Sequence, residues 1–376
     1  MHLTSIDLLE LALPLVEPFI ISGGTMAVRR SLVVILHDDA GHQGYGESPP
    51  FELPFYSEET LGSARLLLRE VLIPRLVGRE IEGPEAVDAL LRQGVRGNPF
   101  ARAALETAAW DLEAHRRGTG IAALLGERLG LTPARRIRCG VALGIPPDRS
   151  TATLERWIED ALTHGYRRIK IKVAPGWDAA PVAAARRALA GTDIPLTVDG
   201  NGSYAWPEHE AALRALDENE LLYIEQPLAP EELLGHVRLS QTLRTPVCVD
   251  ETLHGESTGR QLLALDGPTV WNVKVHRMGG LTEVCRVVRL ARERGVRLWA
   301  GTMPESGLGS QAALGAAALP GFVYPSDLEP SARWFGPGAD VIELGMGSDG
   351  TMEVPGTSIA HRLDQAVFRR TTRRLD

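Results

Sequence analysis

The stretch GYRRIKIKV at residues 165–173 decides the fold of this chain, because it places two of only three lysines on one predicted strand. Lys170 and Lys172 lie two residues apart, so in a strand both side chains point to the same face. The third lysine is Lys274, and all other cations among the 40 lysines and arginines are arginine. Arginine keeps its proton near neutral pH, whereas a lysine shielded from water can lose it. Two neighbouring ammonium groups also repel, which we expect to lower the pKa of one lysine toward neutrality.

Outward from this strand, from about residue 137, short apolar runs alternate with amphipathic segments, which is typical of βα units in a parallel sheet. Strands are predicted at 138–143, 168–173, 196–199, 222–225, 247–250, 270–274, 297–300 and 322–324. Helices are predicted between them, for example at 153–164, 180–190, 208–218, 231–243 and 282–294. Eight strands joined by helices can close a barrel, so the fold class is α/β. We predict a (β/α)7β modified TIM barrel over residues 131–326.

The two ends of the chain lie outside this alternation. Residues 1–130 predict an α+β capping domain, with strands first and helices at 61–77 and 100–117. Residues 327–376 return to strand-like runs, DVIEL and TMEVP, and we expect this segment to pack on the capping domain and complete it.

Composition excludes several classes of protein. The 376 residues are 44% hydrophobic and 23% charged, as in ordinary globular proteins, and the net charge of −8 argues against nucleic-acid binding. No apolar run approaches membrane-spanning length, and the start of the chain resembles a strand rather than a signal peptide. Three isolated cysteines, Cys139, Cys248 and Cys285, are expected to be reduced and buried. Together these features predict a cytoplasmic protein.

Acidic side chains end three of the predicted strands, in TVDGN, YIEQP and CVDET, and Lys274 ends the next in NVKVH. By subtraction, the steps from Lys172 through Asp199, Glu225 and Asp250 to Lys274 are 27, 26, 25 and 24 residues, one βα unit each. All five groups should therefore meet at the carboxyl mouth of the barrel, where barrel enzymes build their sites. Three converging carboxylates predict a hard divalent cation, Mg²⁺ by default, with Mn²⁺ or Co²⁺ able to replace it. The alternative is that each acid caps a helix or pairs with an arginine.

Lys274 should face the lysine pair across the mouth, so that a carbon acid bound between them presents one face to Lys172 and the other to Lys274. Two opposed bases suit a racemase. The same arrangement serves a syn elimination if Lys172 acts first as base and then as acid while Lys274 stays cationic.

An ordered set of motifs then points to a family. These are PFIISGG at 18–24, GYGES at 44–48, PFYSEET at 54–60, RGNPFARAALETAAWDL at 96–112, GYRRIKIKVAPGWD at 165–178, NVKVHRMGG at 272–280, MPESGLG at 303–309 and PSDLEPSARWF at 325–335. With the strand-end acids between them, they resemble the enolase superfamily and its muconate-lactonizing subgroup. Within it, the chain is similar to the o-succinylbenzoate synthase / N-acylamino acid racemase family over nearly its whole length.

The resemblance implies roles for the residues at the mouth. Lys172 matches the proton-transferring lysine, Lys170 the neighbour that adjusts its pKa, and Lys274 the opposing base. Asn201 and Glu251 match positions that support the metal ligands. The implied ligands are Asp199, Glu225 and Asp250.

It also implies a substrate-binding set. Racemising members carry an arginine three residues after the second catalytic lysine, and Arg277 matches it. The capping domain of this family closes over the mouth and sets specificity, which points to the loops around 19–26 and 50–56. The residues expected to contact substrate are Arg277, Glu305, Ser306, Phe19, Ser22, Met303 and Tyr56.

The chain departs from the family pattern at three places. Pro304 stands in the motif that follows the seventh strand, where relatives have leucine, and a proline stiffens that loop. Gly200 replaces the usual alanine after the first metal ligand. Asp327 and Glu329 partly match the Asp-x-Asp with which dipeptide epimerases hold a substrate ammonium group.

These observations favour metal-dependent racemisation of N-acyl, in particular N-succinyl, amino acids through an enediolate. o-Succinylbenzoate synthase, a syn dehydration in menaquinone biosynthesis, is the main alternative, and one site could perform both reactions. Dipeptide epimerase, cycloisomerase and a non-catalytic binding protein are more distant alternatives. The expected partners are a small carboxylate substrate and further copies of the chain in a homo-oligomer, with no nucleic acid and no membrane. His254 and His276 lie near strand ends, but the sequence shows no acid partner for either.

Overall fold

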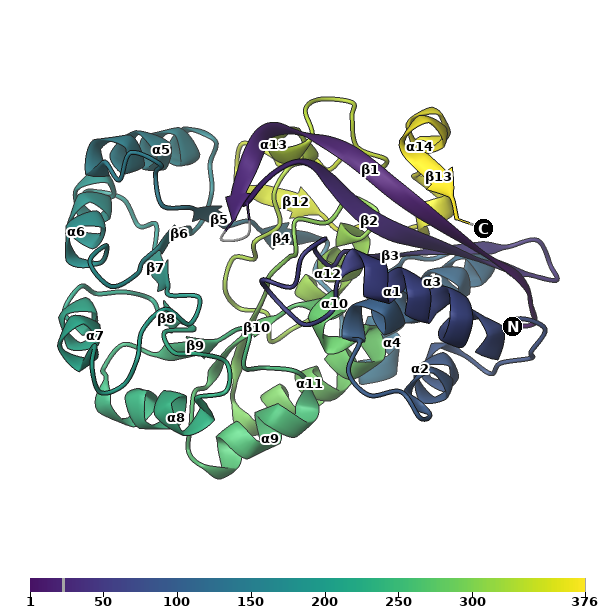
Figure 1. Ribbon diagram of the computed structural model, residues 1–376, viewed down its shortest axis with the longest axis horizontal. Helices are drawn as coiled ribbons and strands as arrows, with labels where there is room; N and C mark the ends of the chain where they lie inside the picture. Colours follow the sequence, from purple (N-terminus) through teal and green to yellow (C-terminus); the bar gives the residue numbers. More distant parts are fainter. Residues whose placement is uncertain (22–23, 376) are drawn as a thin grey trace.

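The larger part of the molecule is a curled parallel sheet surrounded by helices (Figure 1). A computed structural model describes residues 1–21 and 24–375, without the side chains of residues 19–21, 24 and 25. The sheet order is β11-β10-β9-β8-β7-β6-β5, so that strands adjacent in sequence are adjacent in space. The strands are β5 (Val141–Leu143), β6 (Ile169–Lys172), β7 (Leu196–Asp199), β8 (Ile224–Glu225), β9 (Val247–Val249), β10 (Val270–Val273) and β11 (Arg297–Ala300).

The predicted eighth strand at 322–324 is wrong as a continuous strand. This segment forms only isolated parallel bridges, Leu298 with Phe322 and Cys139 with Ser326. A proline at position 325 removes one main-chain N–H and interrupts the ladder. The bridges still join the segment to both edges of the sheet and close the barrel between β11 and β5.

Helices cover the outside of the sheet. They are α5 (Thr151–Thr163), α6 (Ala179–Ala188), α7 (Glu210–Asp217), α8 (Leu233–Thr242), α9 (Glu256–Ala264), α10 (Val275–Met278), α11 (Leu281–Arg294) and α12 (Ser310–Ala317). Helix α5 shows why the pattern was readable, because Leu154, Ile158 and Ala161 bury one face and Ser150 caps the first turn. Helix α12 lies where a helix is expected between the last two predicted strands, but it is buried on every side and carries no such stripe, so the sequence does not predict its bounds.

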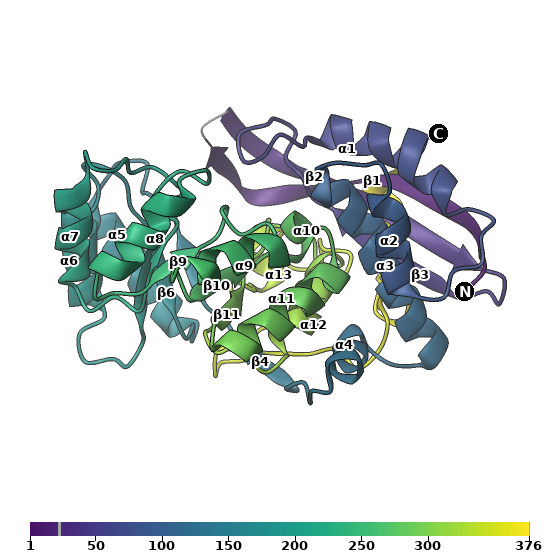
Figure 2. The same cartoon turned by 90° about the horizontal axis from the view of Figure 1, so that it is seen from below.

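The capping domain lies against one side of the barrel (Figure 2). Its antiparallel sheet has the order β13-β1-β2-β3. The strands are β1 (Leu3–Ile21), β2 (Gly24–Asp38), β3 (Gln43–Ser48) and β13 (Thr372–Arg374), and the helices are α1 (Leu61–Leu67), α2 (Pro84–Arg92), α3 (Pro99–Arg117) and α4 (Ile121–Leu129). A π-helical turn at Leu68–Leu72 and a 3-10 turn at Ile73–Arg75 continue α1. Helix α3 packs directly on β3. The two lie so close that a side chain at Gly44 or Gly46 would collide with main-chain oxygens of α3.

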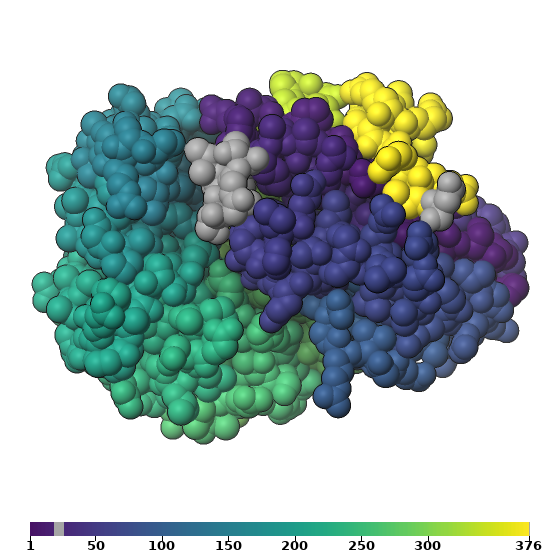
Figure 3. All heavy atoms as spheres, viewed as in Figure 1, coloured from purple at the N-terminus to yellow at the C-terminus, as the bar shows by residue number. Residues whose placement is uncertain are grey.

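The C-terminal segment returns to the capping domain, where β13 pairs with β1 (Figure 3). Before β13 it contains α13 (Ser331–Trp334), β12 (Thr351–Glu353), a 3-10 turn (Ile359–His361) and α14 (Gln365–Thr371). The run TMEVP forms β12, but β12 pairs with β4 (Arg136–Arg138) and not with the cap. The run DVIEL at 340–344 forms no strand. The proposed domain boundaries stay predictions.

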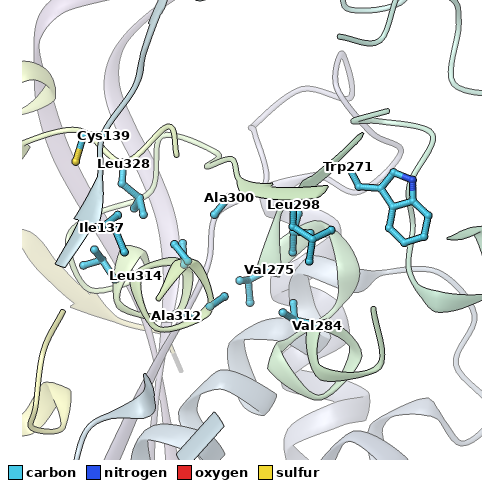
Figure 4. Packing of buried hydrophobic residues seen from close by; sticks show 14 of the residues in the cluster. Ile137, Cys139, Trp271, Val275, Val284, Leu298, Ala300, Ala312, Leu314 and Leu328 are labelled. Carbon is cyan, nitrogen blue, oxygen red and sulfur yellow. The ribbon is translucent and has the colours of Figure 1, made fainter. Parts of the chain in front are cut away.

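One apolar core joins the two parts. Figure 4 shows part of its barrel side, in which Leu298 of β11, Val284 of α11 and Leu314 of α12 belong to the same buried cluster. The same cluster continues into the cap through Leu11 and Val33. Because this apolar packing is continuous from barrel to cap, it fixes the cap over the barrel mouth.

Within residues 1–21 and 24–375, no helix is long and apolar enough to cross a membrane.

Candidate active site

The strand register brings the predicted groups to one end of the barrel. Lys172 lies opposite Asp199, and Asp199 lies opposite Glu225. Asp250 follows directly after β9, and Lys274 follows directly after β10. These residues occupy the carboxyl ends of five consecutive strands, as the spacing predicted.

Lys170 lies deepest in this group. Its side chain is 5% exposed, and its Nζ is 2.9 Å from Glu225 Oε2, 2.7 Å from Asp327 Oδ2 and 3.6 Å from Asp199 Oδ2. The ammonium group also lies 4.6 Å from the ring centre of Trp299. Lys170 is therefore held by several charges and is closed to solvent.

Lys172 is the most accessible of the three lysines, with 31% of its side chain exposed. Its Nζ donates to Asp199 Oδ2 at 2.6 Å and to Asn201 Oδ1. The Asn201 amide in turn donates to Glu251 Oε1 at 2.9 Å. Asn201 thus joins Lys172 to Glu251, and its main-chain N–H donates to Asp199 Oδ1 at 2.9 Å. That Asn201 and Glu251 support the metal ligands stays a prediction.

Lys274 lies under the cap. Its Nζ is 2.9 Å from Asp250 Oδ2 and donates to the Tyr56 hydroxyl at 3.1 Å, with the Tyr56 ring centre 4.9 Å away. Arg277 donates to the same hydroxyl at 3.2 Å and also bonds Asp250. A tyrosine from the cap therefore reaches the second predicted base, and Arg277 completes the contact.

Asp199, Glu225 and Asp250, here called the carboxylate triad, are each at most 1% exposed. Burial and the negative charge of Asp199 raise the pKa of Glu225, although Lys170 opposes them. In the described part of the chain, no group of three or more His, Cys, Asp or Glu side chains is arranged as a metal site. The reason is visible in the contacts, since ammonium and guanidinium groups take the triad oxygens. All the donors are hard oxygen atoms that already attract cations, so the residues fit a divalent metal by chemistry.

The expectation that repulsion lowers a lysine pKa is not met at the two buried lysines. Burial lowers the pKa of Lys170, but Asp327 and Glu225 outweigh burial and bring it well above its ordinary value. Burial likewise lowers the pKa of Lys274, but the negative charge of Asp250 outweighs burial, so the pKa lies above its ordinary value. In this arrangement the carboxylates, and not the second lysine, dominate the field at each ammonium group.

Comparisons with known proteins place this geometry in a family. Residues 4–126 match the family "Mandelate racemase / muconate lactonizing enzyme, N-terminal domain", and residues 153–358 match "Enolase C-terminal domain-like". An N-succinylamino acid racemase of Thermus thermophilus is 40% identical over 99% of this chain and 98% of that protein. An o-succinylbenzoate synthase of Geobacillus kaustophilus is 37% identical over 87% of this chain and 84% of that protein. A solved enolase-superfamily protein of Enterococcus faecalis superposes with TM-score 0.90 at 33% identity, covering 100% of this chain and 99% of that chain.

The chain belongs to the enolase superfamily. Within it, the chain belongs to the group that contains N-succinylamino acid racemases and o-succinylbenzoate synthases. The prediction of an enzyme from the isomerase or lyase classes is confirmed. Members of this superfamily generally use a divalent metal.

The structure gives mixed support for the substrate-binding set predicted from the superfamily. Tyr56 and Arg277 lie at the mouth, and Met303 packs in a buried cluster with Phe51 and Phe100. Ser22 and the side chain of Phe19 lie outside the described residues.

Two further members of that set are buried. Ser306 is 1% exposed, and its hydroxyl is bound to Glu47 of the cap. Glu305 is 5% exposed and accepts from the Met303 N–H at 2.5 Å. Its other oxygen lies 3.8 Å from Nδ1 of buried His276, which thereby gains the acid neighbour that the sequence did not show. Among the described residues, Glu305 Oε1 is buried without a hydrogen-bond partner, and the substrate contacts of both residues stay predictions.

Sequence reasoning missed three residues that contact the site residues from inside the barrel, Gln226, Asn272 and Arg168. Gln226 accepts from the Asp250 N–H at 2.9 Å, and Asn272 donates to Glu225 Oε1 at 2.9 Å. Arg168 is fully buried, bonds Asp327, donates to the Tyr223 hydroxyl at 2.7 Å and lies 4.8 Å from the Trp299 ring centre. The only available signal was that Arg168 precedes Lys170 by two residues and must share its face.

Proposed function

We propose that this chain racemises N-acyl amino acids, in particular N-succinyl derivatives, by moving the α-proton between Lys172 and Lys274. The observation that carries the proposal is the placement of these lysines at opposite ends of the carboxylate triad. Lys172 bonds Asp199 at 2.6 Å and Lys274 lies 2.9 Å from Asp250. The similarity to an N-succinylamino acid racemase over the whole chain supports the same reaction.

In this proposal Asp199, Glu225 and Asp250 hold Mg²⁺. The metal, when bound, supplies the positive charge that stabilises a carboxylate gaining negative charge. Binding of that cation would release the lysine ammonium groups from the triad, because one charge replaces the other. Mn²⁺ or Co²⁺ satisfies the same oxygen donors.

The chain's own residues then move the proton. One lysine, in its neutral form, takes the α-proton from one face and leaves an enediolate. The ammonium group of the other lysine returns a proton to the opposite face, which inverts the centre. For the other enantiomer the two lysines exchange roles, so the two half-reactions use the same site in opposite directions.

A second candidate is o-succinylbenzoate synthase, a dehydration in menaquinone biosynthesis. It needs Lys172 as base and then acid, with Lys274 as a fixed cation. One observation favours it: Lys274 lies 2.9 Å from Asp250 Oδ2 and donates to the Tyr56 hydroxyl at 3.1 Å, which suits a cation held in place. Several relatives with this name are 33–37% identical to the chain.

Dipeptide epimerisation lacks this support. Asp327 is bound to Arg168 and Lys170, and Glu329 is 2.8 Å from Arg333. Both acids that could hold a substrate ammonium group are therefore neutralised within the protein. An uncharged, acylated substrate nitrogen fits this site better.

Proton exchange distinguishes the two leading candidates. The protein is incubated with Mg²⁺ in D₂O and each enantiomer of an N-succinyl amino acid, and the α-proton is followed by NMR. Exchange with racemisation from both enantiomers is expected. Absence of exchange, together with dehydration of the cyclohexadiene precursor of o-succinylbenzoate, would instead support the synthase.

We also infer a cytoplasmic location and a homo-oligomer for this enzyme. The three cysteines are free and buried, which suits a reducing compartment. Size-exclusion chromatography with light scattering tests the oligomer directly.

A further inference from the structure

Arg29 of β2 is a buried arginine at the junction of cap and barrel. It is 2% exposed, and within the described residues no carboxylate forms an ion pair with it. In the part of the chain that the structure describes, its guanidinium group donates only to main-chain oxygens. These are the oxygens of Arg30 (2.7 Å), Pro50 (3.1 Å), Met303 (3.1 Å), Pro304 (3.0 Å) and Pro49.

Four of these five acceptors, all but Arg30 of β2, belong to two segments that face each other across the junction. One is the cap loop, residues 49–60, and the other is the barrel loop, residues 301–309. Three of the five oxygens belong to prolines, which have no N–H with which to join a regular ladder. The planar fork of arginine offers five N–H groups in fixed directions, whereas a lysine offers a single point of charge. Arg29 therefore provides hydrogen bonds that the two loops cannot make with each other.

The cap loop carries the side chain that reaches the second predicted base. Tyr56 lies 3.1 Å from Lys274 and 3.2 Å from Arg277. At the start of the same loop, the Phe51 ring centre lies 4.8 Å from the Arg29 guanidinium carbon. Phe51 also packs with Met303 of the barrel loop in one buried cluster. Arg29 thus holds both sides of the contact that brings Tyr56 onto Lys274.

We propose that Arg29 is a positioning residue that sets how the cap loop places Tyr56 on Lys274. The inference rests on the proposed two-lysine reaction. Among the described residues, the side-chain partners of Lys172 are Asp199 and Asn201, and Tyr56 is not one of them. Loosening the cap loop therefore impairs proton transfer at Lys274 more than at Lys172.

The test compares Arg29→Lys with Arg30→Lys. Arg30 is the next residue on β2, and its side chain pairs at the surface with Glu10 and Glu52. With N-succinyl amino acid enantiomers in D₂O, kcat for α-proton abstraction falls at least tenfold more for one enantiomer in Arg29→Lys. That enantiomer is the one whose abstraction is lost in Lys274→Arg. Arg30→Lys stays within twofold of the wild type for both enantiomers, and an equal loss for both in Arg29→Lys overturns the proposal.

Two readouts keep the test decisive. Amide hydrogen exchange over residues 51–60 and 301–305 rises in Arg29→Lys but not in Arg30→Lys, and unchanged exchange overturns the proposal. Amide exchange can be measured without any enzyme activity. If the wild type does not racemise its substrate, the proposed function is rejected, and amide exchange alone then tests whether Arg29 positions the cap loop. If Arg29→Lys does not fold, Tyr56→Phe removes the hydroxyl contact alone. It must show the same enantiomer asymmetry, and equal rates for both enantiomers contradict the role of Arg29.

Discussion

Single residues in this site depend on buried charges that neutralise one another. Asp327 shows this most clearly, because its two oxygens meet Arg168 and Lys170 in a layer closed to solvent. Burial raises the pKa of Asp327, but the positive charges of Arg168 and Lys170 outweigh burial and lower the pKa to about 2. Removing one partner from such a group leaves an uncompensated charge in the interior.

Asp327→Asn is therefore expected to lower the free energy of unfolding by roughly 3 kcal/mol, because it leaves Arg168 and Lys170 without their shared carboxylate. Urea unfolding followed by circular dichroism measures the change. Asp160→Asn is the matched control, since Asp160 is an exposed acid on α5 and should change stability by less than about 0.5 kcal/mol. If the free energy of unfolding falls equally in the two variants, the ion pairs of Asp327 with Arg168 and Lys170 do not stabilise the fold.

The sequence revealed the three lysines and the triad because strand spacing alone brings them together. It could not reveal Arg168 or Arg29, because each is one arginine among many and only the fold buries it. Glu305 and Ser306 stay predictions as substrate contacts. What the sequence could not reveal is their partners in the fold, the Met303 N–H for Glu305 and the cap residue Glu47 for Ser306.

Among the elements, α3 connects the cap to the barrel. Glu106 in the middle of α3 accepts from the Leu281 and Thr282 N–H groups at 2.7 Å each, and so caps α11 of the barrel. It also accepts from Trp110 Nε1 at 2.8 Å. Burial raises the pKa of Glu106 from 4.5 to about 7.

This shift predicts a pH dependence of stability. Between pH 4.5 and 7 folded Glu106 binds more proton than unfolded Glu106, so its contribution is full below pH 4.5 and is lost as the pH rises through 7. The loss is at most about 3 kcal/mol. In Glu106→Gln the free energy of unfolding should fall less over this range, as measured by urea unfolding at several pH values. Glu113→Gln on the same helix should keep the wild-type slope, and an unchanged slope in Glu106→Gln would contradict the assignment.

Elements with one apolar face were predicted within a few residues, as α5 and α11 show. Helix α12 has no such face because it is buried all round, so no periodic signal marks its bounds. The apolar run at 322–324 predicts a strand, but this segment forms only isolated bridges beside a proline. The partner of β12 is also invisible from sequence, because pairing over long separations depends on the fold.

For the whole molecule, the continuous core between cap and barrel means that binding at the mouth should be felt by the entire fold. We predict that Mg²⁺ raises the Tm of the wild type, since a ligand at about 100 times its Kd stabilises by about 2.7 kcal/mol. Asp250→Asn should lose most of this rise, whereas Asp193→Asn, an exposed acid before β7, should keep it. Scanning calorimetry with and without the metal gives the answer, and an equal rise in both variants would place the metal elsewhere.

The proposed reaction needs two lysines that act on opposite faces of one substrate. Exchange of the α-proton in D₂O with Mg²⁺ tests this need, with Lys172→Arg and Lys274→Arg compared on both enantiomers of an N-succinyl amino acid. Each variant keeps a cation but loses a base, so each should lose proton abstraction from one enantiomer by about 10²–10⁴-fold, and the two variants should lose opposite enantiomers. If exchange persists with both enantiomers in either variant, or if both variants lose the same enantiomer, the two lysines do not act on opposite faces.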